Sequence, residues 1–372
     1  MSHPLLARSG TFSLSGGTNA VGESLLLGCA PGATGTYLLS GTGNVSAAVE
    51  SVGYFSSGVF RQTGGTNSAG MILVGDAAGG TGLYEQSGGV ASVANQLWVG
   101  YNATASGTYT ISNGTLSAGS IVVGQNGSGT FNLNGGTVTV YAGGITKGTG
   151  TAVFNFGGGA LKAGNSFSSN VPMTLTGTGG NAKIDTSGYT VSLSGALSGS
   201  GGLNKLGDGG LILSGPNTYS GSTTVGAGKL SISADTNLGT PPAGLVVDQL
   251  TLNGGALLVT DICALAPTRG LTVSGSGGIE VSSTKTLTLA GPLALSGSAT
   301  LVKTGLGTLI ITGPQNYGLG AVLQFGSSGG SGPDIAGSYS AAPVPEPSAL
   351  ALLSVGAIGL LAYVWRRRKR AG

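Results

Sequence analysis

The chain has 372 residues, of which 75 are glycine and only 7% are charged, and its formal net charge is +3. Glycine at this frequency without a three-residue period excludes collagen, and the aliphatic content is too high for a disordered linker. Residues 1–345 hold 10 Lys and Arg against 11 Asp and Glu, a net charge of −1, because five basic residues lie near the C-terminal end. The body therefore has no basic stripe for nucleic acid, which is excluded from the expected partners.

The first residues, MSHPLLARSG, do not have the pattern of a secretory signal peptide. They contain one Arg, no apolar core of useful length and no small-residue cleavage site. Because the C-terminal tail predicts export, we expect that the natural start lies upstream of Met1 or that the gene is truncated. His3, the only histidine, falls in this segment, so no histidine is available to a catalytic site in the body.

A repeat with a period of about 22–25 residues begins at Gly10. Each copy opens with a glycine, has an aromatic residue two positions later, and continues with alternating residues and a glycine-containing turn. The opening glycines are Gly10, Gly35, Gly58, Gly82, Gly107 and Gly129, and a degenerate seventh copy starts at Gly150. In the first five copies a second run closes on a further glycine, at Gly28, Gly53, Gly75, Gly100 and Gly124. Every copy is therefore expected to hold short β segments divided by turns.

No single copy can bury its apolar face, but stacked copies can. Alternation in the segment TFNLN points Phe131 and Leu133 to one face and Asn132 to the other. The repeat aromatics would then form one internal column of Phe12, Tyr37, Phe60, Tyr84, Tyr109 and Phe131. The pattern predicts an all-β fold, a parallel β-helix or solenoid with about 22–25 residues per coil and roughly 14 coils. A β-propeller is the alternative, but its blades need about 40 residues.

The pattern changes at about Ser198, so we divide the expected solenoid into residues 1–197 and residues 198–325. Within the second part, Leu203–Leu230 returns in weaker form as Leu301–Leu323, with Lys205 matched by Lys303. The first copy resembles the autotransporter-associated β-strand repeat through Lys205, Gly207, Gly209, Leu211, Asn217, Thr218, Tyr219, Gly221, Val225, Gly228 and Leu230. This resemblance implies part of a right-handed β-helix in a secreted passenger domain, and it implies no chemistry.

Residue types that build catalytic or metal sites are scattered along the chain. No two of the 11 acids in the body lie within two residues of each other. Two pairs have the spacing to stack on adjacent coils, Asp185 with Asp208 and Asp235 with Asp261. Cys29 and Cys263 lie about ten coils apart, too far for a disulfide, and we expect both to be buried as small apolar side chains. We therefore predict no catalytic residue, no metal and no cofactor.

The C-terminal part consists of a linker and a tail. Residues 326–343 are a flexible linker rich in Gly, Ser and Ala, and the tail is residues 344–372. Its uncharged apolar run, residues 348–365, would form a helix of about 27 Å, close to the hydrocarbon thickness of a bilayer. The basic cluster that follows is Arg366, Arg367, Arg368, Lys369 and Arg370. The positive-inside rule keeps this cluster in the cytoplasm, so residues 348–365 span the membrane and the body lies outside the cytoplasm.

The tail resembles the PEP-CTERM sorting signal of Gram-negative bacteria, with Pro345, Glu346 and Pro347 before a transmembrane helix and an Arg-rich end. The resemblance implies recognition near this motif by an exosortase, a membrane enzyme that resembles cysteine transpeptidases. It also implies release or transfer of the body to the cell surface, often in organisms that produce exopolysaccharide. The prolines keep the motif extended and accessible just outside the bilayer.

Three functions remain open from the sequence. The first is an exported, non-enzymatic structural or adhesin-like protein of the cell surface or extracellular matrix, with exopolysaccharide as a candidate partner. The second is a polysaccharide-active lyase or glycosidase, because β-helix enzymes gather charged side chains in one groove. The third is a truncated fragment of a larger autotransporter-like passenger. The repeats predict an elongated rod without a recognisable catalytic motif, which favours the structural or adhesin-like protein.

Overall fold

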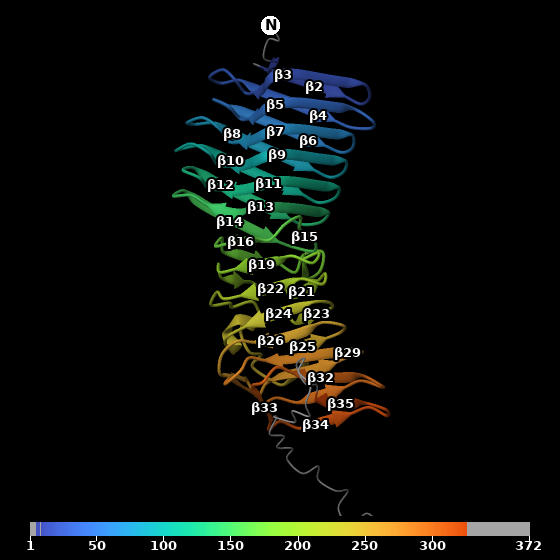
Figure 1. Cartoon of the computed structure of the whole chain (residues 1–372). Helices are drawn as coiled ribbons and strands as arrows, with labels where there is room; N and C mark the ends of the chain where they lie inside the picture. The colour runs from blue at the N-terminus through green and yellow to red at the C-terminus, as the bar shows by residue number, and fades with distance from the viewer. Residues whose placement is uncertain (1–4, 8, 326–372) are drawn as a thin grey trace, which may run out of the picture.

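The computed structural model describes residues 5–7 and 9–325, which form one elongated stack of β coils (Figure 1). The chain winds through about 14 turns of about 23 residues each. Strands pair in parallel with the strands of the coils before and after them, as when Tyr84 pairs with Phe60 on one side and Tyr109 on the other. The predicted parallel β-solenoid is therefore confirmed.

The strands lie in three parallel sheets, with 23, nine and three members. In the first half of the rod, the largest sheet contains β1 (Leu5–Ala7), β3 (Thr18–Leu27), β5 (Asn44–Val52), β7 (Thr66–Val74), β9 (Val90–Val99), β11 (Thr115–Val123) and β13 (Thr137–Lys147). It continues through β15 (Ala160–Ala163), β16 (Phe167–Ser169), β18 (Ala182–Asp185), β19 (Thr190–Leu193), β21 (Leu203–Leu206), β22 (Gly210–Leu213), β23 (Thr223–Val225) and β24 (Lys229–Ile232). Its last members are β25 (Val246–Leu252), β26 (Ala256–Val259), β28 (Arg269–Val273), β29 (Ser276–Val281), β31 (Leu293–Leu295), β32 (Thr300–Thr304), β34 (Gln315–Tyr317) and β35 (Val322–Phe325).

The other two sheets cover separate parts of the rod. The nine-stranded sheet contains β2 (Gly10–Leu14), β4 (Thr34–Leu39), β6 (Ser57–Gln62), β8 (Thr81–Gln86), β10 (Ser106–Ile111), β12 (Ser128–Leu133), β14 (Thr151–Phe156), β17 (Met173–Leu175) and β20 (Leu197–Ser198). The three-stranded sheet contains β27 (Cys263–Leu265), β30 (Thr286–Leu289) and β33 (Thr308–Ile311). Among the described residues the only helix is a short 3-10 helix, η1 (Asp235–Leu238).

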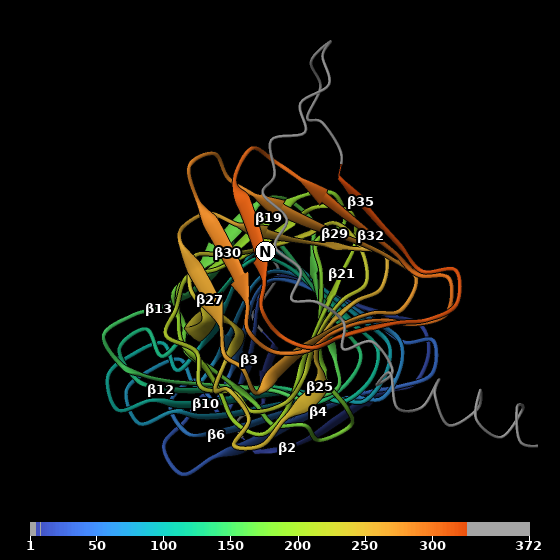
Figure 2. The same cartoon turned by 90° about the horizontal axis from the view of Figure 1, so that it is seen from below.

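The coils change shape after β14. Up to that point each coil contributes one long strand to the largest sheet and one short strand to the nine-stranded sheet, whereas later coils hold several short strands. Seen along the rod, β27 and β30 lie on a different side from β2, β4 and β6 (Figure 2). Pairing continues across the predicted boundary at residue 198, since Thr174 pairs with Ser198 and Ala182 with Leu203. The division into residues 1–197 and 198–325 thus stays a prediction about sequence pattern.

The predicted aromatic column is confirmed and runs one coil further than expected. Ring centroids of neighbouring members are 4.5–5.3 Å apart, and Phe154 stacks on Phe131 at 5.0 Å. All members are buried except Phe12, which ends the column and is 38% exposed. In the seventh copy Ala152, and not Gly150, takes the place of the opening glycine, because it pairs with Gly129.

The closing glycines lie where adjacent coils approach most closely. Gly75 has φ +69°, and a Cβ at this position would lie 2.3 Å from the carbonyl oxygen of Ser106 in a neighbouring coil. Gly100 has φ +75°, and its Cβ would lie 2.4 Å from the carbonyl of Ser128. An L side chain is disfavoured at such φ values, and here it also has no space. Both the turn and the packing of coils therefore require glycine.

Candidate functional site

The predicted sorting residues lie outside the described residues. They are the motif and basic cluster Pro345, Glu346, Pro347, Arg366, Arg367, Arg368, Lys369 and Arg370, together with the predicted span 348–365. Within residues 5–7 and 9–325, no helix is long and apolar enough to cross a membrane. The candidate sites described below therefore all lie in the body of the chain.

Four acidic side chains of the described residues, Glu85, Asp235, Asp261 and Glu280, each pair with a cation on another coil. Four ion pairs have N–O distances of 2.7–2.9 Å: Arg61–Glu85, Lys229–Glu280, Arg269–Asp235 and Lys285–Asp261. Asp235 and Asp261, whose spacing allowed them to stack, thus each bind a different cation. In the described part of the chain, no group of three or more His, Cys, Asp or Glu is placed to hold a metal ion.

Asp185 and Asp208 do not form a carboxylate pair in register. Asp185 pairs with Leu206, two positions before Asp208. The Asp185 carboxylate instead accepts hydrogen bonds from the backbone N–H and the hydroxyl of Ser187, at 2.9 and 3.0 Å. Burial lowers the pKa of the nearby Lys205 amine to about 8, although both carboxylates favour its charged form.

Residues of the long repeat hold its turns together. Lys205 is buried, and its ammonium group donates to the carbonyl oxygens of Leu206, Gly207 and Ala227, at 2.9, 2.6 and 3.1 Å. In the second copy Lys303 donates in the same way to the carbonyls of Thr304 and Gly305, at 2.8 and 2.9 Å. The hydroxyls of buried Tyr219 and of Thr223 are hydrogen-bonded at 2.7 Å. These contacts give the repeat lysine and tyrosine structural roles.

The two cysteines differ in exposure, and both are free. Burial, with a smaller effect of the Asp235 carboxylate, raises the pKa of Cys263 to about 11, so this thiol stays protonated at neutral pH. Cys29 is only partly buried. The prediction of a buried Cys29 is wrong, because this residue follows the closing glycine of its coil and lies in the turn beyond the end of β3.

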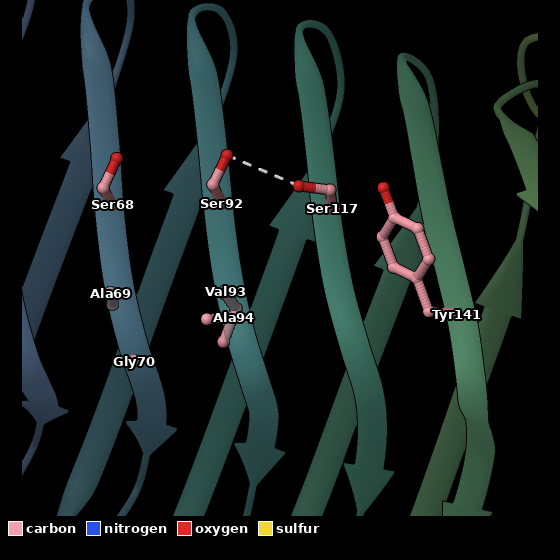
Figure 3. Close-up of a pocket in the computed structure, with 8 residues that line it drawn as sticks. All are labelled: Ser68, Ala69, Gly70, Ser92, Val93, Ala94, Ser117 and Tyr141. Atoms are coloured by element: carbon pink, nitrogen blue, oxygen red, sulfur yellow. Dashed lines mark hydrogen bonds between the residues drawn. The ribbon is translucent and has the colours of Figure 1, made fainter. Parts of the chain in front are cut away.

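A shallow hollow lies on the outer face of the largest sheet, across β7, β9, β11 and β13 (Figure 3). Its volume is about 430 Å³, and its lining is Ser68, Ala69, Gly70, Ser92, Val93, Ala94, Ser117 and Tyr141. The three serines form a row along the rod, because Ser92 pairs with both Ser68 and Ser117. The Tyr141 ring stands beside Ser117 at the end of this row (Figure 3) and is 46% exposed.

The lining of this hollow is uncharged and offers two kinds of contact. Serine hydroxyls both donate and accept hydrogen bonds, and a tyrosine ring presents a flat apolar face with a polar tip. Sequence reasoning did not single out Tyr141, although a signal was present. The alternation of TVTVY buries Val138 and Val140, so Tyr141 must point outward.

A second hollow, of about 280 Å³, lies where β6, β8 and β10 end. Its lining is Arg61, Thr63, Glu85, Gln86, Ser87, Thr110 and Ser112. Arg61 and Glu85 bind each other here at 2.9 Å. The two charges therefore offset one another, which makes this hollow a weaker candidate for a charged ligand.

Comparison with protein-family models gives two matches, each to part of the chain. Residues 203–232 and 301–318 match the passenger-associated-transport-repeat, and residues 343–369 match the PEP-CTERM protein-sorting motif. Both resemblances seen in the sequence are thereby confirmed. No curated protein and no solved structure gives a significant match. The sorting motif indicates an exported protein that an exosortase recognises, and the matched families bear on catalysis in neither direction.

Proposed function

We propose that this chain, which carries a PEP-CTERM protein-sorting motif behind a solenoid with passenger repeats, is a non-enzymatic structural protein of the cell surface or extracellular matrix. The observation that carries the proposal is the position of the motif, at residues 343–369, on the C-terminal side of a long stack of coils that ends with β35. Such a chain places an extended surface outside the cell. Four acids of the body are each taken up in a separate ion pair, which supports a structural role over turnover of a substrate.

The tail supplies the anchor and the processing signal in this proposal. Residues 348–365 span the inner membrane, and the basic cluster at 366–370 stays on its cytoplasmic side, because charged side chains cross the bilayer at high cost. Pro345, Glu346 and Pro347 then lie just outside the bilayer, where an exosortase reaches them. The linker at residues 326–343 separates the rod from this enzyme.

The proposed matrix partner is an exopolysaccharide that lies along the hollow on β7, β9, β11 and β13. The serine row supplies hydrogen bonds to sugar hydroxyls, and the exposed ring of Tyr141 packs against the apolar face of a sugar. Because the lining carries no charge, this surface fits a neutral polysaccharide better than an acidic one. Its binding should depend little on ionic strength.

Affinity electrophoresis in gels that contain a neutral polysaccharide tests this surface. Tyr141→Ala should weaken binding about fivefold, equivalent to roughly 1 kcal/mol for one lost aromatic contact. Tyr189→Ala is the matched control, because Tyr189 is exposed to a similar degree, 40%, and does not line the hollow. Equal mobility of the two variants in the gel would contradict a role for this hollow.

Substitution of the motif tests the proposed processing separately. A Pro345→Ala, Pro347→Ala double variant keeps the apolar run and the basic cluster, so it should still insert in the membrane. We expect it to accumulate there with its tail attached, whereas the wild type is processed. If the double variant is processed normally, the exosortase does not need these two prolines to recognise the chain.

A further inference from the structure

A buried carboxyl group interrupts the apolar interior of the N-terminal coils. Glu50 on β5 is fully buried and pairs in register with Leu25 on β3 and with Ile72 on β7. The same column continues through Leu97 and Ile121, both aliphatic and buried. Glu50 therefore occupies a position that neighbouring coils fill with Leu or Ile.

One oxygen of this carboxyl group has a partner and the other has none. Buried Asn67 donates through Nδ2 to Glu50 Oε2 at 2.8 Å and to the Tyr84 hydroxyl at 3.0 Å. The Tyr84 hydroxyl donates to Gln62 Oε1 at 2.9 Å, and the Gln62 amide donates to the Val90 carbonyl at 2.9 Å. Among the described residues, the buried side-chain atoms without a hydrogen-bond partner are Glu50 Oε1 and Asn67 Oδ1.

Protonation of Glu50 provides the hydrogen-bond donor that Glu50 Oε1 and Asn67 Oδ1 both lack. A carboxylate and an amide carbonyl are both acceptors, so neither can satisfy the other while Glu50 is ionised. A proton on Glu50 Oε1 creates a donor on a side chain that Asn67 already contacts. Leaving such groups unsatisfied in an apolar interior is costly, and leaving a charge there is more so.

Among the described residues, no cation acts on the carboxyl group of Glu50. The titratable groups that act on the site from the packed strands are the phenols of Tyr37, Tyr84 and Tyr109, and burial raises the pKa of each, with the Glu50 charge adding to the rise. The carboxylate of Asp76 accepts a hydrogen bond from the hydroxyl of Ser51. Ser51 follows Glu50 directly, so its side chain points to the opposite face of the strand. Desolvation accordingly raises the pKa of Glu50 to about 7, against the opposing hydrogen bond from Asn67.

We propose that Glu50 and Asn67 form a proton-dependent acid–amide pair that tightens the N-terminal coils in mildly acidic surroundings and loosens them when Glu50 ionises. In the folded chain Glu50 keeps its proton up to a pH of about 7, whereas in the unfolded chain it releases the proton near pH 4.5, the ordinary pKa of Glu. The stabilisation is therefore complete below about pH 4.5, is lost progressively as pH rises to about 7, and stays absent above that. An exported protein meets the pH of its surroundings directly, so this pair makes the rod responsive to external acidity.

Denaturant unfolding of the full chain in detergent, at pH 5 and at pH 8, tests the proposal. The wild type should unfold more readily at pH 8, with an unfolding equilibrium constant about 100-fold larger from this pair alone. Glu50→Gln places an amide where the protonated acid stands, so this variant should lose that pH dependence. Glu85→Gln is the matched control, since Glu85 is partly exposed and bound to Arg61, and it should keep the wild-type dependence.

Carbon-13 NMR of the glutamate carboxyls in the wild type gives a second measurement that needs no variant. The Glu50 signal should titrate with a midpoint near 7. A midpoint near 4.5, or a pH dependence that Glu50→Gln leaves unchanged, would overturn the proposal.

Discussion

Two glycines of the same turn separate two costs of an alanine substitution: the strain of a left-handed backbone and the lack of space between coils. Gly75 and Gly79 both have positive φ, +69° and +80°, but a Cβ on Gly79 meets nothing within 4 Å, whereas one on Gly75 meets the Ser106 carbonyl at 2.3 Å. In Gly79→Ala the left-handed conformation costs about 1 kcal/mol, and the lower entropy of the unfolded chain offsets about 0.4–1 kcal/mol of it. Gly75→Ala adds the displacement of a neighbouring coil, about 1–3 kcal/mol for an overpacked site. We therefore expect a loss of about 1–4 kcal/mol for Gly75→Ala and of less than about 1 kcal/mol for Gly79→Ala.

Guanidinium unfolding followed by circular dichroism and by tryptophan fluorescence measures this difference. Trp98 reports on the right coils, because it pairs with Leu73, two residues before Gly75. The midpoint for Gly75→Ala should fall well below that of the wild type, and the midpoint for Gly79→Ala should stay close to it. Equal losses in the two variants would refute the reasoning, since the closing glycine would then serve the turn alone.

Two further predictions concern the core and can be measured by the same unfolding experiment. Arg269→Met should cost about 3–5 kcal/mol, because it leaves Asp235 and two buried carbonyl groups without their donor, whereas loss of the exposed Lys285–Asp261 pair should have a much smaller effect. Phe60→Ala should cost about 3–5 kcal/mol from the middle of the aromatic column, and Phe12→Ala clearly less, because Phe12 ends the column and is 38% exposed. Similar losses within either pair of variants would contradict the burial on which these values rest.

The first half of the rod could be predicted because the repeat of 22–25 residues and the two-residue alternation within each strand point to the same buried positions. The repeat places Phe60, Tyr84 and Tyr109 in one column, and the alternation within each strand turns them inward. The signal for the buried carboxyl group was also present. Glu50 lies three residues before a closing glycine, where other copies have Leu25 or Ile72, but only the stacked register reveals that this position is interior.

The second half was harder to predict because its coils vary in length. The average repeat suggested that Asp185 would stack on Asp208, yet the coil there is shorter than the average, and Asp185 pairs with Leu206. The buried pair of Arg269 and Asp235 lies further apart along the chain than one average coil, because η1 and the segment after it lengthen the coil. No fixed repeat length predicts such contacts.

The hollow on the largest sheet depends on how several strands lie side by side. Ser68, Ser92 and Ser117 come together through pairing register, with a β-bulge in the same strands. Tyr141 could be assigned outward from its own strand, but its place at the end of the serine row follows only from the neighbouring coils. The site therefore emerges from stacking and not from any local motif.

The central claim is that the body lies outside the cytoplasm and that the tail holds it at the envelope until it is sorted. Protease accessibility and fractionation of cells that produce the full chain, or a chain that lacks the tail at positions 344–372, test this most directly. The account predicts that the body of the full chain is accessible at the envelope or surface and that the shortened chain is not retained there. A body that stays in the cytoplasm in both cases would contradict it.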